Sequence, residues 1–276
     1  MDLRRLEDAI GEYGLDAYRD AILATVRPAI YLGLGEAGQG SVGQSRIGGF
    51  PDLPDSIPWP EDPVLGRLRS FILQINLAEL PAFPENPLPR AGMLYLFLDE
   101  NEDDADQLVL YTGGEPLRPR QPEADAQFIT DWYDDLAAHR LTFELGPDIP
   151  RWATEDYYAL IEAGIDDEED ALGDVGRALS DGSVGKLLGH AGGIGHDPRE
   201  DAYVVREVNA EWLYDYARRG ELDMAGAARW TNLLTVDSID EAGLMFGDVG
   251  YLQLLVHEDD LRREELSRVY VNLESS

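Results

Sequence analysis

The apolar segments of this chain are short, and their length restricts the fold more than any other feature. The longest unbroken apolar run covers only Met93 to Leu98, whereas a bilayer-spanning helix needs roughly 20 such residues. Comparable short runs, bounded by Gly, Pro or acidic residues, predict β-strands. These strands are expected at 29–35, 70–76, 92–98, 108–112, 230–237, 251–256 and 269–273.

Helical spacing of apolar residues occurs mainly at the N-terminus and between the two groups of strands. Residues 2–27 predict two short amphipathic helices that separate near Gly11 and Gly14. Thr154 is a candidate N-cap for the helix that follows it. Further helical segments are expected at 131–138, 154–163, 168–179, 209–219 and 259–266. The predicted fold class is α+β, with antiparallel sheets and with N-terminal and peripheral helices.

Two parts of the chain resemble each other. SFILQINLAEL followed by AGMLYLFLDENED parallels TNLLTVDSIDE followed by DVGYLQLLVHEDD. Each has a strand that ends in a polar residue (Asn76 or Asp237), a connector, a Gly and a second strand. We expect residues 1–28 to pack on a single domain of 29–276, built from two pseudo-repeats of about 29–125 and 182–276 with a helical acidic insert between them. Chance similarity between strands is the alternative.

A Gly- and Pro-rich segment, residues 35–63, predicts a long ordered loop. Its densest part is SRIGGFPDLPDSIPWP, residues 45–60. This part could be a rigid recognition loop. It could also be a plug packed over a sheet face, with Phe50, Leu53, Ile57 and Trp59 pointing inward, and we favour the plug because a long ordered loop needs buried anchors.

The charge of the chain restricts its partners. Asp and Glu number 55 against 22 Lys and Arg, the net charge is -33, and Lys186 is the single lysine. A negative field repels nucleic acid and anionic lipid, and no run of basic residues exceeds two, so we expect neither as a partner. A basic protein partner and adaptation to high salt both fit the acidity. The N-terminus shows no apolar signal segment, and we expect a cytoplasmic location.

Motifs for cofactor or covalent chemistry are weak. The chain has no Cys, which excludes a thiolate zinc site and a Cys nucleophile. Gly33, Gly35 and Gly38 match a dinucleotide pattern, but no apolar helix follows. Gly185-Lys186 fails as a phosphate loop because Leu187 replaces the Ser or Thr that would hold magnesium. The spacing of His190 and His196 fits no zinc motif, so we predict no metal, cofactor or catalytic residue.

Several motifs together resemble a known family. They are SRIGGFPDLP with WP after it, FILQINLAELP, GMLYLFLD, GKLLGH, NLLTVD, FGDVGYLQLLV with HEDDL, and SRVY. In this order they are similar to the YwqG-like family of uncharacterised bacterial proteins, over roughly residues 25–276. The resemblance implies an α+β fold with antiparallel sheets. Members often lie beside genes of secreted polymorphic toxins, which implies an immunity-type inhibitor with no known reaction.

Two functional hypotheses follow, and a binding protein is favoured over an enzyme. The first is an immunity-type inhibitor that captures a basic, toxin-like effector through its acidic surface. Its candidate residues are Asp99, Glu100, Glu102, Asp103, Asp104, Asp106, Asp166, Asp167, Glu168, Glu169 and Asp170. The alternative is a small-ligand binder or hydrolytic enzyme with a cleft between the two halves. Its candidate residues are Arg46, Trp59, Gln74, Asn76, His190, Asp237 and Asp248.

Overall fold

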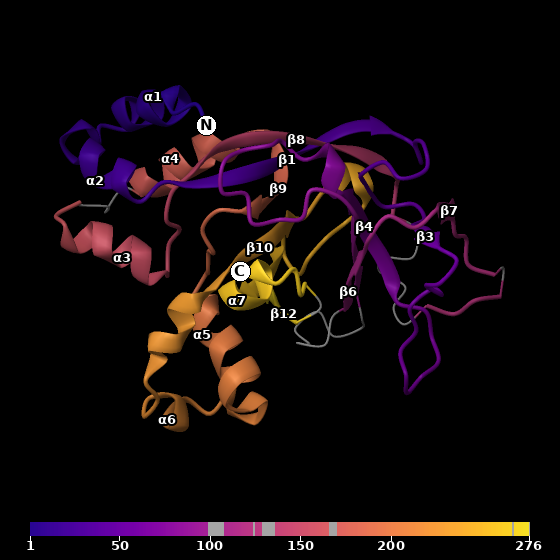
Figure 1. The fold of residues 1–276 in the computed structure, drawn as a ribbon. Coiled ribbons are helices and arrows are strands. Elements are labelled where there is room, and N and C mark those ends of the chain that lie inside the picture. The colour runs from indigo at the N-terminus through magenta and orange to yellow at the C-terminus, as the bar shows by residue number, and fades with distance from the viewer. Residues whose placement is uncertain (99–107, 124, 129–135, 166–169, 267, 276) are drawn as a thin grey trace.

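The computed structural model describes the chain except for residues 99–107, 124, 129–135, 166–169, 267 and 276. Its fold is α+β, as the sequence predicts, and is dominated by one large sheet in which neighbouring strands are antiparallel. The strand order is β12-β11-β10-β9-β1-β8-β2-β4-β5-β6 (Figure 1). The strands are β1 (Arg27–Ala37), β2 (Arg46–Ile47), β4 (Ser70–Asn76), β5 (Met93–Leu98), β6 (Leu108–Thr112), β8 (His139–Asp148), β9 (Ser183–Leu188), β10 (Trp230–Asp237), β11 (Tyr251–His257) and β12 (Val269–Glu274). A small second sheet pairs β3 (Asp52–Pro54) with β7 (Leu117–Pro119).

Helices cover the sheet and extend from it. The α-helices are α1 (Arg4–Glu12), α2 (Arg19–Ala24), α3 (Glu155–Glu162), α4 (Ala171–Ser180), α5 (Pro198–Tyr203), α6 (Tyr216–Arg219) and α7 (Glu258–Arg262). A π-helical segment, η3 (Val204–Asn209), continues α5, and short 3-10 turns are η1 (Asp16–Tyr18), η2 (Leu77–Glu79), η4 (Ala210–Trp212), η5 (Met224–Arg229) and η6 (Asp240–Ala242). In Figure 1, α1 to α4 gather beside β1 and β8, whereas β3 and β7 lie at the opposite end of the molecule.

Two apolar clusters explain this layering. The larger one fills the sheet face that carries Ile30, Leu187, Leu234 and Leu254. The second joins Leu6, Ile22 and Leu160 of the helices to Ala29 and Tyr31 of β1. Because successive strand residues point to opposite faces, Ile30 enters the first cluster while its neighbours Ala29 and Tyr31 enter the second. The sheet is therefore covered on both faces at β1.

Most predicted elements are found, with instructive exceptions. Thr154 caps α3, and its hydroxyl accepts a hydrogen bond from the Tyr157 N–H at 3.4 Å. The single helix expected at 209–219 is wrong, since the chain forms η4 and the separate four-residue α6 there. Residues 35–63 are not entirely loop, because β2 and β3 lie within them. The helix expected at 131–138 falls largely outside the described residues, as does the start of the one expected at 168–179.

The pairs β4–β5 and β10–β11 lie on either side of the central β1–β8 pair. Each pair has a register shift at the same place, four residues before the polar end of its first strand: at Ile72 before Asn76, and at Leu233 before Asp237. Equivalent backbone hydrogen bonds follow the two strands: the N–H of Leu77 donates to the Gly92 carbonyl, and the N–H of Ser238 donates to the Gly250 carbonyl. These shared irregularities support the predicted duplication, which stays a prediction.

The segment around residues 46–59 packs as a plug. Leu53 is fully buried against Phe71, Tyr95 and Phe97, and Ile57 and Trp59 pack on the same cluster. Within this segment, Arg46 Nη1 donates to Asp52 Oδ2 at 2.9 Å, and both side chains are only 1% exposed. Burial of a matched ion pair explains why the plug can seal this part of the sheet without an unpaired charge.

Candidate functional site

A cavity of about 640 Å³ lies over the face of β1, β9, β10 and β11 that points away from the larger core. We call it the Lys186 cavity. Strand register builds its floor: Tyr31 lies opposite Lys186, Lys186 opposite Thr235, and Thr235 opposite Gln253. Directly opposed residues project to the same face, so these four side chains form one polar row across four strands. The lining residues are Tyr31, Arg151, Trp152, Tyr157, Asp170, Gly173, Arg177, Ser180, Ser183, Gly185, Lys186, Gly192, Gly193, Ile194, Thr235, Asp237, Tyr251 and Gln253.

Asp148, at the end of β8, organises the basic groups of the cavity. Its carboxylate is fully buried and pairs with Lys186 Nζ. It also accepts hydrogen bonds from Arg151 Nη2 at 3.2 Å and from the His190 backbone N–H at 2.8 Å. The Tyr31 hydroxyl lies 3.4 Å from the carboxylate and donates to the Pro147 carbonyl at 2.9 Å. One acid thus fixes a lysine, an arginine and the loop that carries His190.

Burial shapes the ionisation of these groups. Burial opposes the charge on Asp148, but Lys186 and Arg151 outweigh it and hold the pKa of Asp148 below its ordinary value. Burial lowers the pKa of Lys186 to about 8, against the attraction of Asp148. The same desolvation raises the pKa of Asp237, although Arg151 and Lys186 favour its charged form. An amine and an acid with shifted pKa values therefore line one cavity, a pattern frequent at functional sites.

Glycines let the chain approach these charged groups closely. Gly189 has a φ of +75°, and a Cβ there would lie 2.5 Å from Asp148 Oδ2. A Cβ at Gly176 would lie 2.7 Å from Arg151 Nη1, which places the guanidinium directly against α4. Gln253 fastens the covering loop, since its amide can donate to the Gly192 carbonyl at 3.1 Å and accept from the Gly192 N–H at 3.2 Å.

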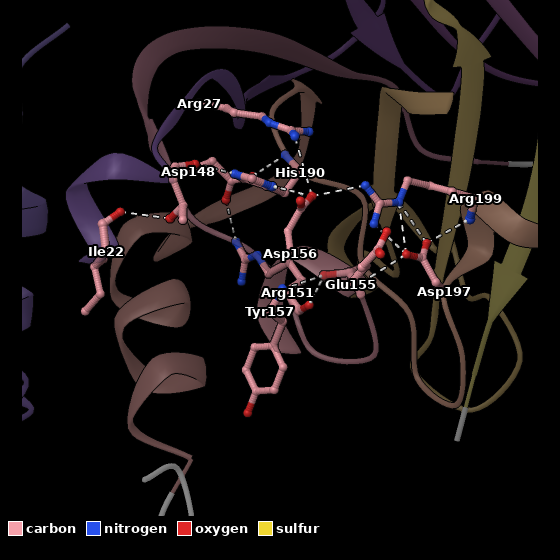
Figure 2. Close-up of polar contacts among 12 residues, drawn as sticks. Ile22, Arg27, Asp148, Arg151, Glu155, Asp156, Tyr157, His190, Asp197 and Arg199 are labelled. Carbon is pink, nitrogen blue, oxygen red and sulfur yellow. Dashed lines mark hydrogen bonds and ion pairs between the residues drawn. The ribbon is translucent and has the colours of Figure 1, made fainter. Parts of the chain in front are cut away.

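A second polar network stands behind the cavity. Figure 2 shows Arg27, His190 and Arg199 converging on the carboxylate of Asp156. Arg199 Nη1 donates to Asp156 Oδ2 at 3.0 Å, and His190 Nδ1 lies 3.7 Å from the same oxygen. The proximity of His190, together with Arg199 and Arg27, lowers the pKa of Asp156 despite partial burial. The network connects α3, the His190 loop and α5.

The structure separates the predicted ligand residues. Asp237 lines the Lys186 cavity, and His190 is buried behind it with Nε2 at 2.8 Å from the Thr25 carbonyl. Arg46 and Gln74 lie under the plug, bonded to Asp52. The remaining three are dispersed: Asn76 caps η2, Trp59 lines a different cavity of about 710 Å³, and Asp248 is exposed after β10.

Most of the predicted acidic interface falls outside the described residues. This applies to Asp99, Glu100, Glu102, Asp103, Asp104, Asp106, Asp166, Asp167, Glu168 and Glu169. Asp170 is described: it precedes α4, lies at the Lys186 cavity, and pairs with Arg177 at 2.8 Å.

Sequence reasoning missed the charged network at the cavity: the lining residues Arg151 and Lys186 and their buried partner Asp148. One available signal was the single lysine of the chain, in a segment where Gly185 and Gly189 allow close approach. Asp148 and Lys186 are 38 positions apart in the sequence and meet only because β8 and β9 both pair with β1. No local spacing could have joined them.

The described residues contain neither a metal-binding cluster of acidic and histidine side chains nor a membrane-spanning helix. Among the described residues, no group of three or more His, Cys, Asp or Glu side chains is arranged to hold a metal ion. Within the same residues, every helix is too short or too polar to span a membrane.

Comparison with known proteins places the chain in a family without assigning a reaction. No curated protein matches the sequence. A family model described as a domain of unknown function, DUF1963, matches residues 45–274. The match covers most of the chain, including the plug, Asp148 and all lining residues of the Lys186 cavity except Tyr31. The chain therefore belongs to the DUF1963 family of domains of unknown function.

Proposed function

We propose that the Lys186 cavity binds a small organic anion. The observation that carries the proposal is the local concentration of basic side chains. Acids outnumber bases 55 to 22 in the whole chain, yet the described lining of this cavity contains three bases, Arg151, Arg177 and Lys186, against the two acids Asp170 and Asp237. A recess rich in basic side chains is the part of an acidic protein where an anion of matching size is repelled least and finds hydrogen-bond donors.

The geometry favours a ligand with an anionic group and a hydroxyl or carbonyl group. Arg151 uses one terminal nitrogen on Asp148, and its side chain is 25% exposed, so the guanidinium can also meet a ligand carboxylate or phosphate. Asp237, Thr235 and Tyr251 supply hydrogen-bonding groups across the cavity. The volume of about 640 Å³ lies in the range of small-molecule sites.

Titration with small anions tests this proposal. A panel of hydroxy acids, keto acids and sugar phosphates would be screened by thermal shift, and the stabilising members measured by calorimetry. Arg151→Gln removes the anchoring charge and is expected to weaken binding at least about ten-fold. Arg120→Gln is the matched control, because Arg120 lines the other cavity, and it should bind like the wild type.

Two results would contradict the proposal. One is a panel in which no anion binds the wild-type protein. The other is equal binding by wild type, Arg151→Gln and Arg120→Gln, since binding would then be independent of the Lys186 cavity. Circular dichroism of each variant separates loss of binding from loss of folding.

A second candidate function rests on the net charge of -33. We propose that the chain is YwqG-like, as its motifs suggest, and that its acidic exterior captures a basic, toxin-like effector as an immunity-type inhibitor. Electrostatic capture gives fast association that weakens with salt. Mixed with a cationic product of a neighbouring gene, the protein should associate at least about ten-fold more slowly in high salt than in low salt. A salt-independent rate would argue against this mechanism.

A further inference from the structure

The only lysine of this chain occupies the floor of its charged cavity. All 21 other basic residues are arginine, including Arg46, which lies opposite Gln74 as Lys186 lies opposite Thr235. Both cations are buried and paired with an acid. They differ in what covers them, because the plug seals Arg46 whereas Lys186 lines an open cavity. Arginine stays protonated, but an amine can release its proton and act as a nucleophile.

The contacts of Lys186 allow such a release. Asp148 would keep two donors, the His190 N–H at 2.8 Å and Arg151 at 3.2 Å, if the lysine lost its proton. The carboxylate would therefore not be left buried and unpaired, which is the costly outcome when an ion pair is broken. Desolvation, which lowers the pKa of Lys186 to about 8, increases the fraction of neutral amine.

We propose that Lys186 forms a Schiff base with the carbonyl carbon of a small aldehyde acid or keto acid held in the cavity. This inference rests on the proposed anion-binding function. The ligand carboxylate would pair with Arg151, which shares Asp148 with Lys186. Because both side chains pair with Asp148, the Arg151 guanidinium and the Lys186 amine lie in the same part of the cavity. A ligand whose carboxylate pairs with Arg151 would therefore place its α-carbonyl carbon beside Lys186 Nζ.

The step balances without any further reactant. The ammonium gives one proton to Asp237, and the neutral nitrogen attacks the carbonyl carbon to form a C–N bond. The carbonyl oxygen gains one proton from the nitrogen and a second from Asp237, and leaves as water. One ammonium and one carbonyl thus become one protonated imine and one water. The charge on nitrogen is the same before and after, so Asp148 can stabilise both states.

Asp237 is suited to this proton transfer. It follows two residues after Thr235, which lies opposite Lys186, and so belongs to the same face of the sheet. Its charge acts on Lys186, and burial raises its pKa toward the range of a general acid.

Reductive trapping with glyoxylate tests the inference. The protein would be incubated with glyoxylate and cyanoborohydride, and the adduct located by peptide mapping. We expect one carboxymethyl group on Lys186, with a yield that saturates with glyoxylate. The yield should fall when excess glycolate is added, because glycolate has the carboxylate but no aldehyde carbon for the amine to attack. Peptide mapping separates Lys186 from the N-terminal amine, the one other primary amine in the chain. It does so in the wild-type protein, without relying on the folding of a variant.

Two variants sharpen the test. Lys186→Arg keeps a cation for Asp148 and should abolish the internal adduct. Arg120→Lys adds a reference amine at the other cavity, and at neutral pH we expect Lys186 to react at least about ten-fold faster than this reference, because an ordinary lysine with a pKa of about 10.4 is almost entirely protonated there.

The outcomes distinguish the two proposals. Saturable trapping at Lys186 that glycolate suppresses supports both. If glycolate binds in calorimetry but no adduct forms at Lys186, the Schiff-base inference is wrong and the anion site stands. If glycolate does not bind and Lys186 is not labelled, the inference fails, and the wider anion panel decides the proposed function separately. Labelling that neither saturates nor responds to glycolate also overturns the inference, since it shows only an accessible amine.

Discussion

Asp148 shows how one buried carboxylate can define a site. It pairs with Arg151, three residues after it, and with Lys186 and the His190 N–H, which belong to β9 and the loop that follows β9. A fully buried charge with several donors is well compensated, whereas a buried cation that loses its counter-ion is not. The stability of the cavity and its charge therefore depend on the same residue.

We predict that Asp148→Asn destabilises the protein by about 3–5 kcal/mol, because it leaves Lys186 and Arg151 without their shared negative charge. The measurement is the free energy of unfolding in urea. Asp174→Asn is the matched control: Asp174 pairs with Arg177 on the surface, and its loss should cost at most about 1 kcal/mol. Equal costs for the two variants would show that Asp148 is not the central counter-ion.

The pH dependence of stability should reveal how much the ionised carboxylate of Asp156 contributes to the folded state. Its pKa in the folded protein is lowered by the neighbouring His190 and by Arg199 and Arg27, against partial burial. Its contribution is therefore complete above the unfolded pKa of about 3.9 and is lost as pH falls toward the folded value. We predict that the difference in unfolding free energy between wild type and Asp156→Asn is large near neutral pH and shrinks below about pH 4. A difference that stays constant over this range would contradict the assignment.

Among the elements, the β9 strand and the loop after it form the cavity floor and wall. Lys186 takes its place in the polar row through the register of β9 with β1 and β10. The loop then turns at Gly189, where the left-handed backbone lets the His190 N–H reach Asp148. The turn is thus part of the site rather than a connection alone.

We predict that Gly189→Ala is much more destabilising than Gly182→Ala. Both positions have a φ of +75°, so both variants incur a backbone cost of about 1–2 kcal/mol. At Gly182 nothing lies within 4 Å of the added Cβ, whereas at Gly189 the Cβ would lie 2.5 Å from Asp148 Oδ2. Unfolding in urea gives the comparison, and similar costs would mean that the Asp148 carboxylate moves aside freely.

The sequence predicts those elements whose own residues determine them. The apolar runs of β4, β5, β10 and β11 and the Thr154 cap are local signals. In contrast, β8 and β9 contain Gly146, Pro147 and Gly185, which weaken the strand pattern, and both are held by pairing with β1. Most of the candidate site escaped prediction for the same reason: Asp237, which ends a clear strand, was a candidate residue, but the network around Lys186 was not. Asp148, Arg151 and Lys186 acquire their relationship through tertiary pairing.

At the scale of the whole molecule, the net charge of -33 should make stability depend on salt. Like charges on a compact chain repel each other, and salt screens this repulsion. We predict that Tm near neutral pH rises by several degrees between about 0.1 M and about 1 M sodium chloride. Near pH 4, where many carboxylates are protonated, the rise should be much smaller. A Tm that does not respond to salt at neutral pH would mean that the acids are compensated locally.

The single lysine on the cavity floor has a practical consequence. Amine-reactive dyes normally attach to many surface positions, but this chain offers them Lys186 and the N-terminus only. Once the N-terminus is blocked, a fluorophore coupled to Lys186 would change its emission when water or another molecule enters the cavity. The protein thus provides its own attachment point for a sensor of whatever molecule enters.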